Sequence, residues 1–124
     1  MGVFRRFLHR LRESDEERLA EEVREWCEAV PGTIRIVDAP NRKRVTLAGV
    51  VNRISLVPGE AGDTLEAVLT DGTGSITAAW TGRRGIPGLT LGSRVVLTGV
   101  LSETTGGRRM VNPAFEFAPA PSEP

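Results

Sequence analysis

The segment Leu69-Thr70-Asp71-Gly72-Thr73-Gly74-Ser75-Ile76 interrupts an alternating strand pattern for four residues only. Asp71 can accept hydrogen bonds from the backbone two residues further on, and Gly72 and Gly74 supply the positive φ angles that a tight reversal needs. Apolar residues occupy every second position on both sides of the turn: Leu65, Ala67 and Leu69 before it, and Ile76, Ala78 and Trp80 after it. The pattern predicts a β-hairpin with one buried face.

Further strand patterns lie on both sides of this hairpin. With its two strands, at about 63–70 and 74–81, they make five predicted strands, the others being 45–54, 94–101 and about 108–116. Gly49 and Gly99 fall inside two of them, where glycine is typical of a bulge, a sharp bend or a close backbone approach. An irregular link, Gly82 to Gly92, separates the third strand from the fourth. These features predict a mainly β fold, a five-stranded OB-fold barrel.

The chain before the barrel has a helical pattern. Apolar residues recur at helical spacing, and Ser14 followed by Glu17 forms a capping box. We expect two helices, at about 3–12 and 15–30, or one long helix bent near Ser14, and Pro31-Gly32 ends the helical region. The predicted organisation is an N-terminal α-helical leader (1–32), the barrel (33–117), which opens with a short extended piece at 33–37, and a disordered tail (118–124) with three prolines.

Charge is balanced in sum but unevenly distributed. The chain has 16 basic and 16 acidic residues, so no overall field attracts a nucleic acid or a membrane. Residues 1–12 hold four arginines and no acid, residues 13–30 hold eight acids against two arginines, and residues 31–117 hold ten basic against seven acidic residues. The predicted barrel is therefore the more basic part.

Residue types that carry chemistry are scarce. Cys27 is the only cysteine and His9 the only histidine, so no internal disulfide and no cysteine-rich or histidine-rich metal site is expected. No nucleophile motif, phosphate loop or carboxylate cluster occurs, and we expect a protein that is not an enzyme and uses no cofactor. The chain lacks a signal-peptide core and a membrane-spanning stretch, and we expect it to be cytoplasmic.

Several pieces of the β region, in order and spacing, resemble the nucleic-acid-binding OB-fold family of tRNA anticodon-binding type, which includes the wedge domain of bacterial branched-DNA helicases. The resemblance spans about 45–117 and rests on Val45-x-Leu47-x-Gly49-x-Val51, Leu69-x-Asp71-Gly72-Thr73-Gly74-x-Ile76, Trp80, Leu91-Gly92-x-x-Val95-x-Leu97-x-Gly99 and Asn112-Pro113. The whole chain is also similar to small actinobacterial-type proteins in which a helical leader precedes one such domain.

This resemblance implies binding of single-stranded or structured DNA or RNA across the second and third strands, mainly through backbone and shape. Arginines near that face are suited to phosphates, small Thr77 permits close approach, and Asn112 offers a base-edge hydrogen bond. Glu66 opposes a purely electrostatic groove. The candidate nucleic-acid-binding residues are Arg44, Arg53, Thr77, Arg83, Arg84, Arg108, Arg109 and Asn112.

Aromatic residues for base stacking are few, and alternation turns Trp80 inward. This scarcity keeps open an alternative function, a protein–protein interaction adaptor built from the barrel and the helical leader. The basic amphipathic start, residues 3–12, is suited to packing on the barrel, on a second protomer or on an anionic membrane surface, and we favour the protein contacts over the membrane. Cys27 lies in the same apolar stripe as Trp26 and is expected to be buried.

Overall fold

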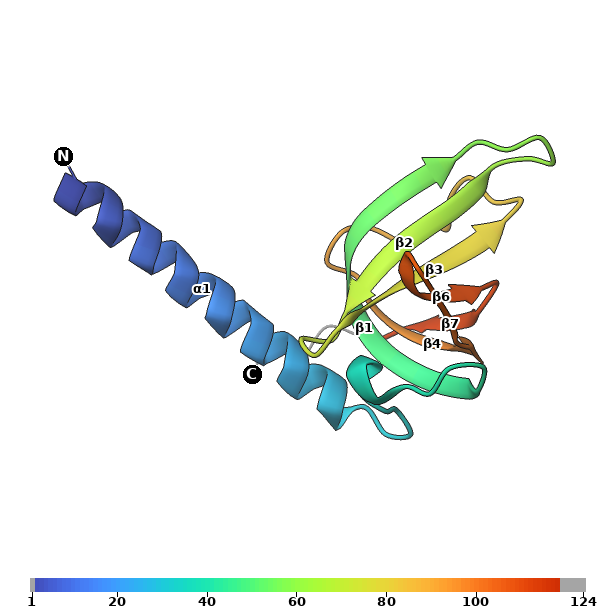
Figure 1. Ribbon diagram of the computed structural model, residues 1–124, viewed down its shortest axis with the longest axis horizontal. Helices are drawn as coiled ribbons and strands as arrows, with labels where there is room; N and C mark the ends of the chain where they lie inside the picture. The colour runs from blue at the N-terminus through green and yellow to red at the C-terminus, as the bar shows by residue number, and fades with distance from the viewer. Residues whose placement is uncertain (1, 119–124) are drawn as a thin grey trace.

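The computed structural model describes the backbone of residues 2–118 and the side chains of residues 15–118. One helix leads into a β-rich body (Figure 1). The elements are α1 (Gly2–Ala29), the 3-10 helix η1 (Ile36–Asp38), and the strands β1 (Arg44–Val57), β2 (Thr64–Thr70), β3 (Ser75–Thr81), β4 (Arg94–Val100), β5 (Ser102–Thr104), β6 (Gly107–Val111) and β7 (Ala114–Phe117). The tail predicted at 118–124 lies outside the described residues except for Ala118, whose backbone N–H donates to the Arg94 carbonyl at 2.9 Å.

The leader is one continuous helix, so the prediction of two helices is wrong and the alternative of one long helix is confirmed without its bend. Figure 1 shows this helix straight and running away from the sheet toward its N-terminus. Residues 13–18 contain charged residues with good helix propensity and neither glycine nor proline, so Ser14 alone does not interrupt the helix. The helix ends at Ala29, just before the predicted stop at Pro31-Gly32. No helix in the described part of the chain is long and apolar enough to cross a membrane.

The strands form one seven-stranded mixed sheet in the order β5-β6-β3-β2-β1-β4-β7. All neighbours are antiparallel except β3 and β6, which are parallel. The ladder is open, with β5 and β7 as its edges among the described residues. The predicted mainly β fold is confirmed, but the predicted five-stranded barrel is wrong in strand number and the sheet is not closed. Only Asn112 and Pro113 separate β6 from β7, although the two strands lie near opposite ends of this order. The sheet therefore curls until its ends approach each other.

The predicted strand at 108–116 is broken at Asn112-Pro113. Asn112 has a φ of 51°, outside the strand region, and proline has no N–H to donate to a ladder. The chain leaves β3 here and joins β4 as β7. Likewise, the piece predicted to be extended at 33–37 ends in the 3-10 turn η1, because the Ile36 N–H bonds to the Asp71 carboxylate at 2.8 Å instead of a strand.

The two glycines inside the strands allow neighbouring segments to pack closely against the backbone. A Cβ at Gly49 would lie 3.0 Å from Leu69 Cβ, and one at Gly99 would lie 3.3 Å from Pro113 Cβ. The irregularity in β1 lies elsewhere, between Val51 and Arg53, where Asn52 has no partner in the β2 register. A bulge at this point bends the strand.

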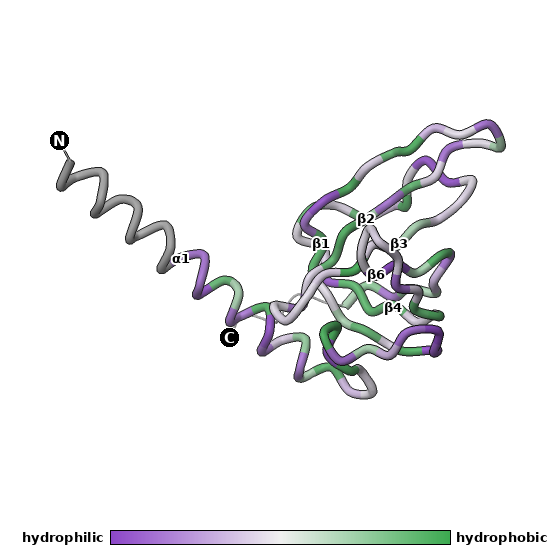
Figure 2. The backbone as a smooth tube through the Cα atoms, in the orientation of Figure 1, coloured by the Kyte–Doolittle hydropathy of each residue, from purple (hydrophilic) through white to green (hydrophobic). Residues whose placement is uncertain are grey.

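The core fills the inside of the curled sheet, and Figure 2 shows hydrophobic and hydrophilic residues alternating along the strands. Trp80 is only 4% exposed, which confirms its inward orientation. Its indole N–H donates to the Pro113 carbonyl at 3.1 Å, and its ring meets Phe115 edge to face at 5.5 Å. The largest fully buried side chains are Ile36, Leu47, Val51, Leu69, Ile76, Val95, Leu97, Leu101 and Met110.

The β2–β3 turn is held by the carboxylate of Asp71, which is 3% exposed. One oxygen accepts from the Thr73 N–H at 2.9 Å, the Thr73 hydroxyl at 2.6 Å and the Gly74 N–H at 3.2 Å. The other oxygen accepts from the Ile36 N–H across 35 positions of sequence. The turn chemistry predicted for Asp71 is confirmed. Only Gly72 has the positive φ expected of both glycines (86°); Gly74 is instead pressed close to Ile36 Cγ2, 3.3 Å from a Cβ built there.

Candidate nucleic-acid interface

One cross-strand row on the outside of the sheet unites three of the predicted site residues. Arg53 on β1 lies opposite Val68 on β2, Val68 lies opposite Thr77 on β3, and Thr77 lies opposite Arg109 on β6. Paired residues of adjacent strands point to the same face of a sheet. Their neighbours Ala67, Leu69, Ala78 and Met110 are buried, so this row points outward.

A second row runs beside the first. It consists of Ser55, Glu66, Ala79 and Val111. Glu66 joins the two rows, because its carboxylate accepts from the Arg109 guanidinium at 2.6 Å and both side chains are partly buried. We call these two rows together the open face. It carries two arginines, one acid and small or aliphatic side chains, with no aromatic ring.

The β1–β2 loop borders one end of the open face, together with the segment that follows β3. Arg83 and Arg84 are both exposed there, and Arg84 pairs with Asp63 at 3.0 Å. The Gly82 N–H donates to the Asp63 carbonyl at 2.9 Å, which holds the two segments together. Exposed pairs of this kind hold a side chain weakly. Arg83 and Arg84 therefore lie near the open face without belonging to either row.

Asn112 has a structural position. Its amide oxygen accepts from the Thr81 N–H at 3.0 Å, and its amide nitrogen donates to the Thr81 hydroxyl at 3.1 Å. Its own N–H donates to the Ala79 carbonyl at 2.7 Å. The side chain thus continues the contact between β3 and the segment after β6, and its hydrogen-bonding groups are engaged within the chain.

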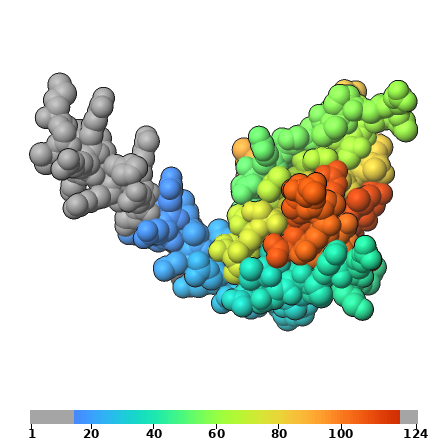
Figure 3. All heavy atoms as spheres, in the orientation of Figure 1, coloured from blue at the N-terminus to red at the C-terminus, as the bar shows by residue number. Residues whose placement is uncertain are grey.

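Arg108 and Arg44 lie away from the row. Arg108 donates to the Val37 carbonyl at 3.3 Å and lies 3.5 Å from the Glu103 carboxylate, so it links β6 to η1 and β5. Figure 3 shows this part of the chain at the surface between the β2–β3 hairpin and the segment around residues 36–44. Arg44 is exposed at the start of β1 opposite Val100, on the side of the sheet order away from β2.

The other half of the outer surface lies beside the C-terminal end of α1 and Val30-Pro31, which follow the helix. We call it the covered face: Thr46 and Ala48 on β1 with Arg94, Val96 and Thr98 on β4. The Trp26 ring lies 5.2 Å from the Arg94 guanidinium carbon, and the Thr46 and Thr98 hydroxyls are 3.1 Å apart. Arg94 is not among the residues predicted from the sequence. Its alternation with the buried Val95 and Leu97 is the feature of the sequence that indicates an outward position.

Cys27 lies buried at the same junction, as predicted. Burial raises the pKa of its thiol from 9.0 to about 12; the Asp71 and Glu28 carboxylates add to the rise and the Arg94 guanidinium opposes it. The backbone carbonyl of Cys27 accepts from the Thr33 hydroxyl at 3.3 Å. A pKa this high keeps the thiol protonated and unreactive near neutral pH.

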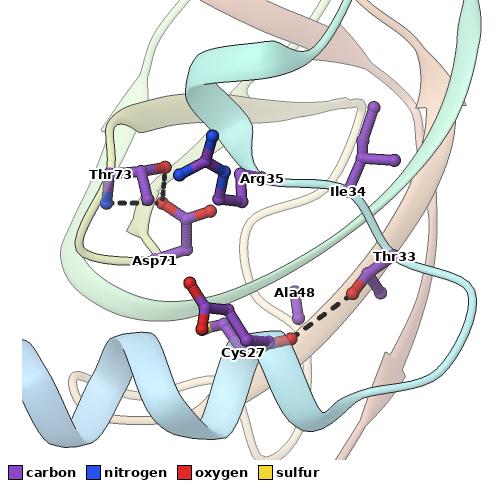
Figure 4. A pocket seen from close by; sticks show the side chains of 8 residues that line it. Cys27, Thr33, Ile34, Arg35, Ala48, Asp71 and Thr73 are labelled. Carbon is purple, nitrogen blue, oxygen red and sulfur yellow. Dashed lines mark hydrogen bonds between the residues drawn. The ribbon is translucent and has the colours of Figure 1, made fainter.

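A small cavity of about 120 Å³ lies where α1, the segment before η1 and the β2–β3 turn meet (Figure 4). Cys27, Thr33, Arg35, Ala48, Asp71 and Thr73 are among its lining residues. The polar groups of Asp71, Thr73 and Thr33 bond to one another or to the backbone. Among the described residues no group of three or more His, Cys, Asp or Glu side chains is arranged to hold a metal ion. The polar side chains at this junction thus hold the chain's own elements in place.

Comparison with known proteins gives a likeness of fold. No protein-family model matches the chain, and no curated protein matches it either. Among solved structures, the chain is similar to the p204 HINb domain, with a TM-score of 0.56 and 17% identity over 69% of this chain and 47% of that one. It is also similar to RecG bound to a three-way DNA junction, with a TM-score of 0.54 and 19% identity over 72% of this chain. The chain spans only 13% of that protein, so the likeness concerns one part of it.

Proposed function

We propose that this chain binds single-stranded or structured nucleic acid through the open face, without catalysing a reaction. The observation that carries the proposal is the row Arg53–Val68–Thr77–Arg109, which places two arginines on either side of small and aliphatic residues across four strands. Cations at the two ends of a shallow row suit two phosphates of one backbone, and a small residue between them lets that backbone come close.

We further propose that the curled sheet is an OB-type barrel, in which β6 and β7 together take the place of one long final strand. The parallel pairing of β3 with β6 and the antiparallel pairing of β4 with β7 support this assignment. In an OB-fold, the face that includes the second and third strands binds oligonucleotides. RecG, whose fold is similar in part, was solved with a three-way DNA junction. The first point favours the open face as the binding surface, and the second favours a nucleic acid as the ligand.

The composition of the open face limits the mode of binding. Base stacking on aromatic rings contributes about 1–3 kcal/mol per base in strong single-strand binders, and neither row of the open face offers a ring. Guanidinium planes can stack on bases in their place. The proposed recognition is therefore mainly of backbone and shape. Glu66 weakens it further, because its ion pair with Arg109 must rearrange before a phosphate takes that arginine.

Fluorescence anisotropy tests the proposal with labelled single-stranded DNA, duplex DNA, forked DNA and single-stranded RNA at several salt concentrations. We expect dissociation constants on the order of micromolar at low salt, and a log–log salt slope of about −1.4 to −2 for two or three phosphate contacts on a single strand. Absence of binding to all four ligands at low salt would overturn the proposal and favour the protein-interaction adaptor.

A further inference from the structure

The helix α1 reaches far beyond the sheet that it packs on. Its contacts with the β-rich body lie near its C-terminal end, at Trp26 and Cys27 and where the Gly72 turn approaches Ala20 and Arg24. Residues 15–20 are all exposed, and Leu19 is 60% exposed. An isolated helix of this kind is marginally stable in water, because most helical stability in proteins comes from packing of one face. A partner along the projecting length (Figure 1) would bury Leu19 and stabilise the helix.

One face of α1 is suited to such a partner. With about 100° between successive residues, the positions 4, 5, 8, 12, 15, 19, 22 and 23 fall within about 50° of a single line along the helix. In sequence these are Phe4, Arg5, Leu8, Arg12, Asp15, Leu19, Glu22 and Val23. Ala20 and Arg24, which adjoin the Gly72 turn, lie more than about 100° away from that line. The face is therefore distinct from the side that meets the hairpin. Trp26, which contacts Arg94, falls on the same line, so the face ends there against the β-rich body.

The order of charges along this face has a direction. Basic residues occupy its N-terminal half and acidic residues its C-terminal half: Arg5 and Arg12, then Asp15 and Glu22. A parallel second helix would place like charges side by side, which is unfavourable. An antiparallel second helix would place the basic half of each copy against the acidic half of the other.

We propose that α1 pairs with α1 of a second copy of this chain in antiparallel orientation, in the register that places Leu8 level with Leu19 of the second copy. In that register Phe4 lies level with Val23 of the second copy. Arg5 lies level with Glu22 of the second copy, and Arg12 level with Asp15 of the second copy. The two arginines on this face thus lie level with acidic residues of the second copy.

The arrangement has a geometric consequence for the whole assembly. Each β-rich body joins its helix near residue 27, and the two junctions lie at opposite ends of the helix pair. With a rise of 1.5 Å per residue, they are about 40 Å apart along the pair. The second helix begins just short of the level of Trp26, so the contacts of α1 with its own sheet are retained.

A charge-swap series tests the pairing by sedimentation equilibrium of the full chain. The wild-type chain is expected to form dimers that weaken as salt rises. The variant Arg5→Glu/Arg12→Glu places acid against acid and is expected to be monomeric at the same concentration. Adding Asp15→Arg and Glu22→Arg to it restores opposite charges only in the antiparallel pair and is expected to restore the dimer. A monomeric wild-type chain, or a fourfold variant that stays monomeric, would overturn the proposal.

Disulfide trapping checks the register independently, in a Cys27→Ala background. An equal mixture of the Leu8→Cys and Leu19→Cys chains is expected to cross-link at least tenfold faster than either chain alone, because positions 8 and 19 lie level only between antiparallel copies. Faster cross-linking of either chain with itself would contradict the antiparallel register. Binding of the wild-type chain to anionic vesicles as a monomer would likewise count against it, since the face would then belong to a membrane surface.

Discussion

The covered face and the open face belong to one sheet but differ in what lies on them. Under α1, Arg94 is overlaid by Trp26, and its Nη1 is buried with no hydrogen-bond partner among the described residues. On the open face, Arg53 is exposed and Arg109 pairs with a carboxylate from a neighbouring strand. An outward arginine thus stabilises packing in one half, whereas the other half keeps its arginines within reach of a ligand. The residue is an arginine in both halves of the sheet, so the role of its side chain depends on whether a helix covers the strand.

The largest expected effect concerns the thiol beneath the helix. At pH 8 the thiolate fraction of Cys27 in the folded chain is roughly a thousandfold below that of the unfolded chain, because burial raises the pKa from 9.0 to about 12. Reaction with an aromatic disulfide reagent should be slower by a similar factor in the native protein than in urea. Comparable rates in the two states would show that α1 does not cover this position.

The same pKa gives a pH dependence with a definite sign. The unfolded thiol loses its proton above about pH 9 while the folded thiol keeps its proton until about pH 12, so this contribution to stability is complete below pH 9 and decreases between these values. The free energy of unfolding of the wild-type chain should therefore fall relative to that of Cys27→Ala across this range.

Asp71→Ala is expected to lower the free energy of unfolding by about 3 kcal/mol. The substitution removes the acceptor for four hydrogen bonds and leaves the Ile36 N–H without one in a buried position. Urea denaturation measures the effect. Asp63→Ala is the matched control, because Asp63 pairs only with the exposed Arg84, and we expect a loss below about 0.5 kcal/mol. An equal loss of unfolding free energy in Asp71→Ala and Asp63→Ala would contradict the stabilising role assigned to the Asp71 turn.

Much of the β architecture was predictable because local patterns determine it. The turn at Asp71, the strands on either side of it and the burial of Trp80 follow from alternation and turn chemistry, and the structure confirms them. The break at Asn112-Pro113 was not predicted as a change of strand partner, because the switch from β3 to β4 depends on the curl of the whole sheet. The continuous helix differs from the predicted pair because one capping box in a run of helix formers does not end a helix.

The sequence predicts which residue types form the candidate site better than it predicts where those residues lie on the sheet. In β1 the inward positions alternate as 45, 47, 49 and 51, so simple alternation would place Arg53 in the core. The bulge at Asn52 shifts the register and brings Arg53 outward beside Val68. The sequence carries no clear signal for that bulge. The sequence pairs Arg108 with Arg109 as a basic group and offers Asn112 for a base-edge hydrogen bond. In the structure, Arg108 donates to Val37 of η1 and Asn112 bonds to Thr81. Their proposed part in binding remains a prediction.

Trp26→Ala tests whether the two faces are independent. Loss of the contact with Arg94 and of apolar area over β4 should cost about 1.5 kcal/mol of stability, while nucleic-acid affinity of the folded fraction should stay within about twofold of wild type. Thermal denaturation and anisotropy give the two readouts. The neighbouring exposed residue supplies the control Glu25→Ala, for which both values should stay near those of the wild type. A loss of affinity in Trp26→Ala would mean that the covered face takes part in binding.

Glu66→Gln is expected to have the smallest effect, and it strengthens binding. Removing the charge frees Arg109 from its ion pair and takes a negative charge off the open face, so affinity for single-stranded nucleic acid should rise about threefold to tenfold at low salt. Glu103→Gln removes the ion-pair partner of Arg108, which lies away from the row, and should leave the affinity for nucleic acid nearly unchanged. A weaker complex in Glu66→Gln would indicate that the ion pair builds the site.

The most direct test of the open face is the salt-dependent affinity of two double variants for the same labelled single strand. Arg53→Gln/Arg109→Gln removes two charges from the row, and Arg18→Gln/Arg35→Gln removes two exposed charges from α1 and the segment before η1. The first is expected to bind about tenfold more weakly, with a salt slope smaller in magnitude by about 1.4, and the second to bind within about twofold of wild type. Equal losses in both variants, or none in the first, would contradict the account.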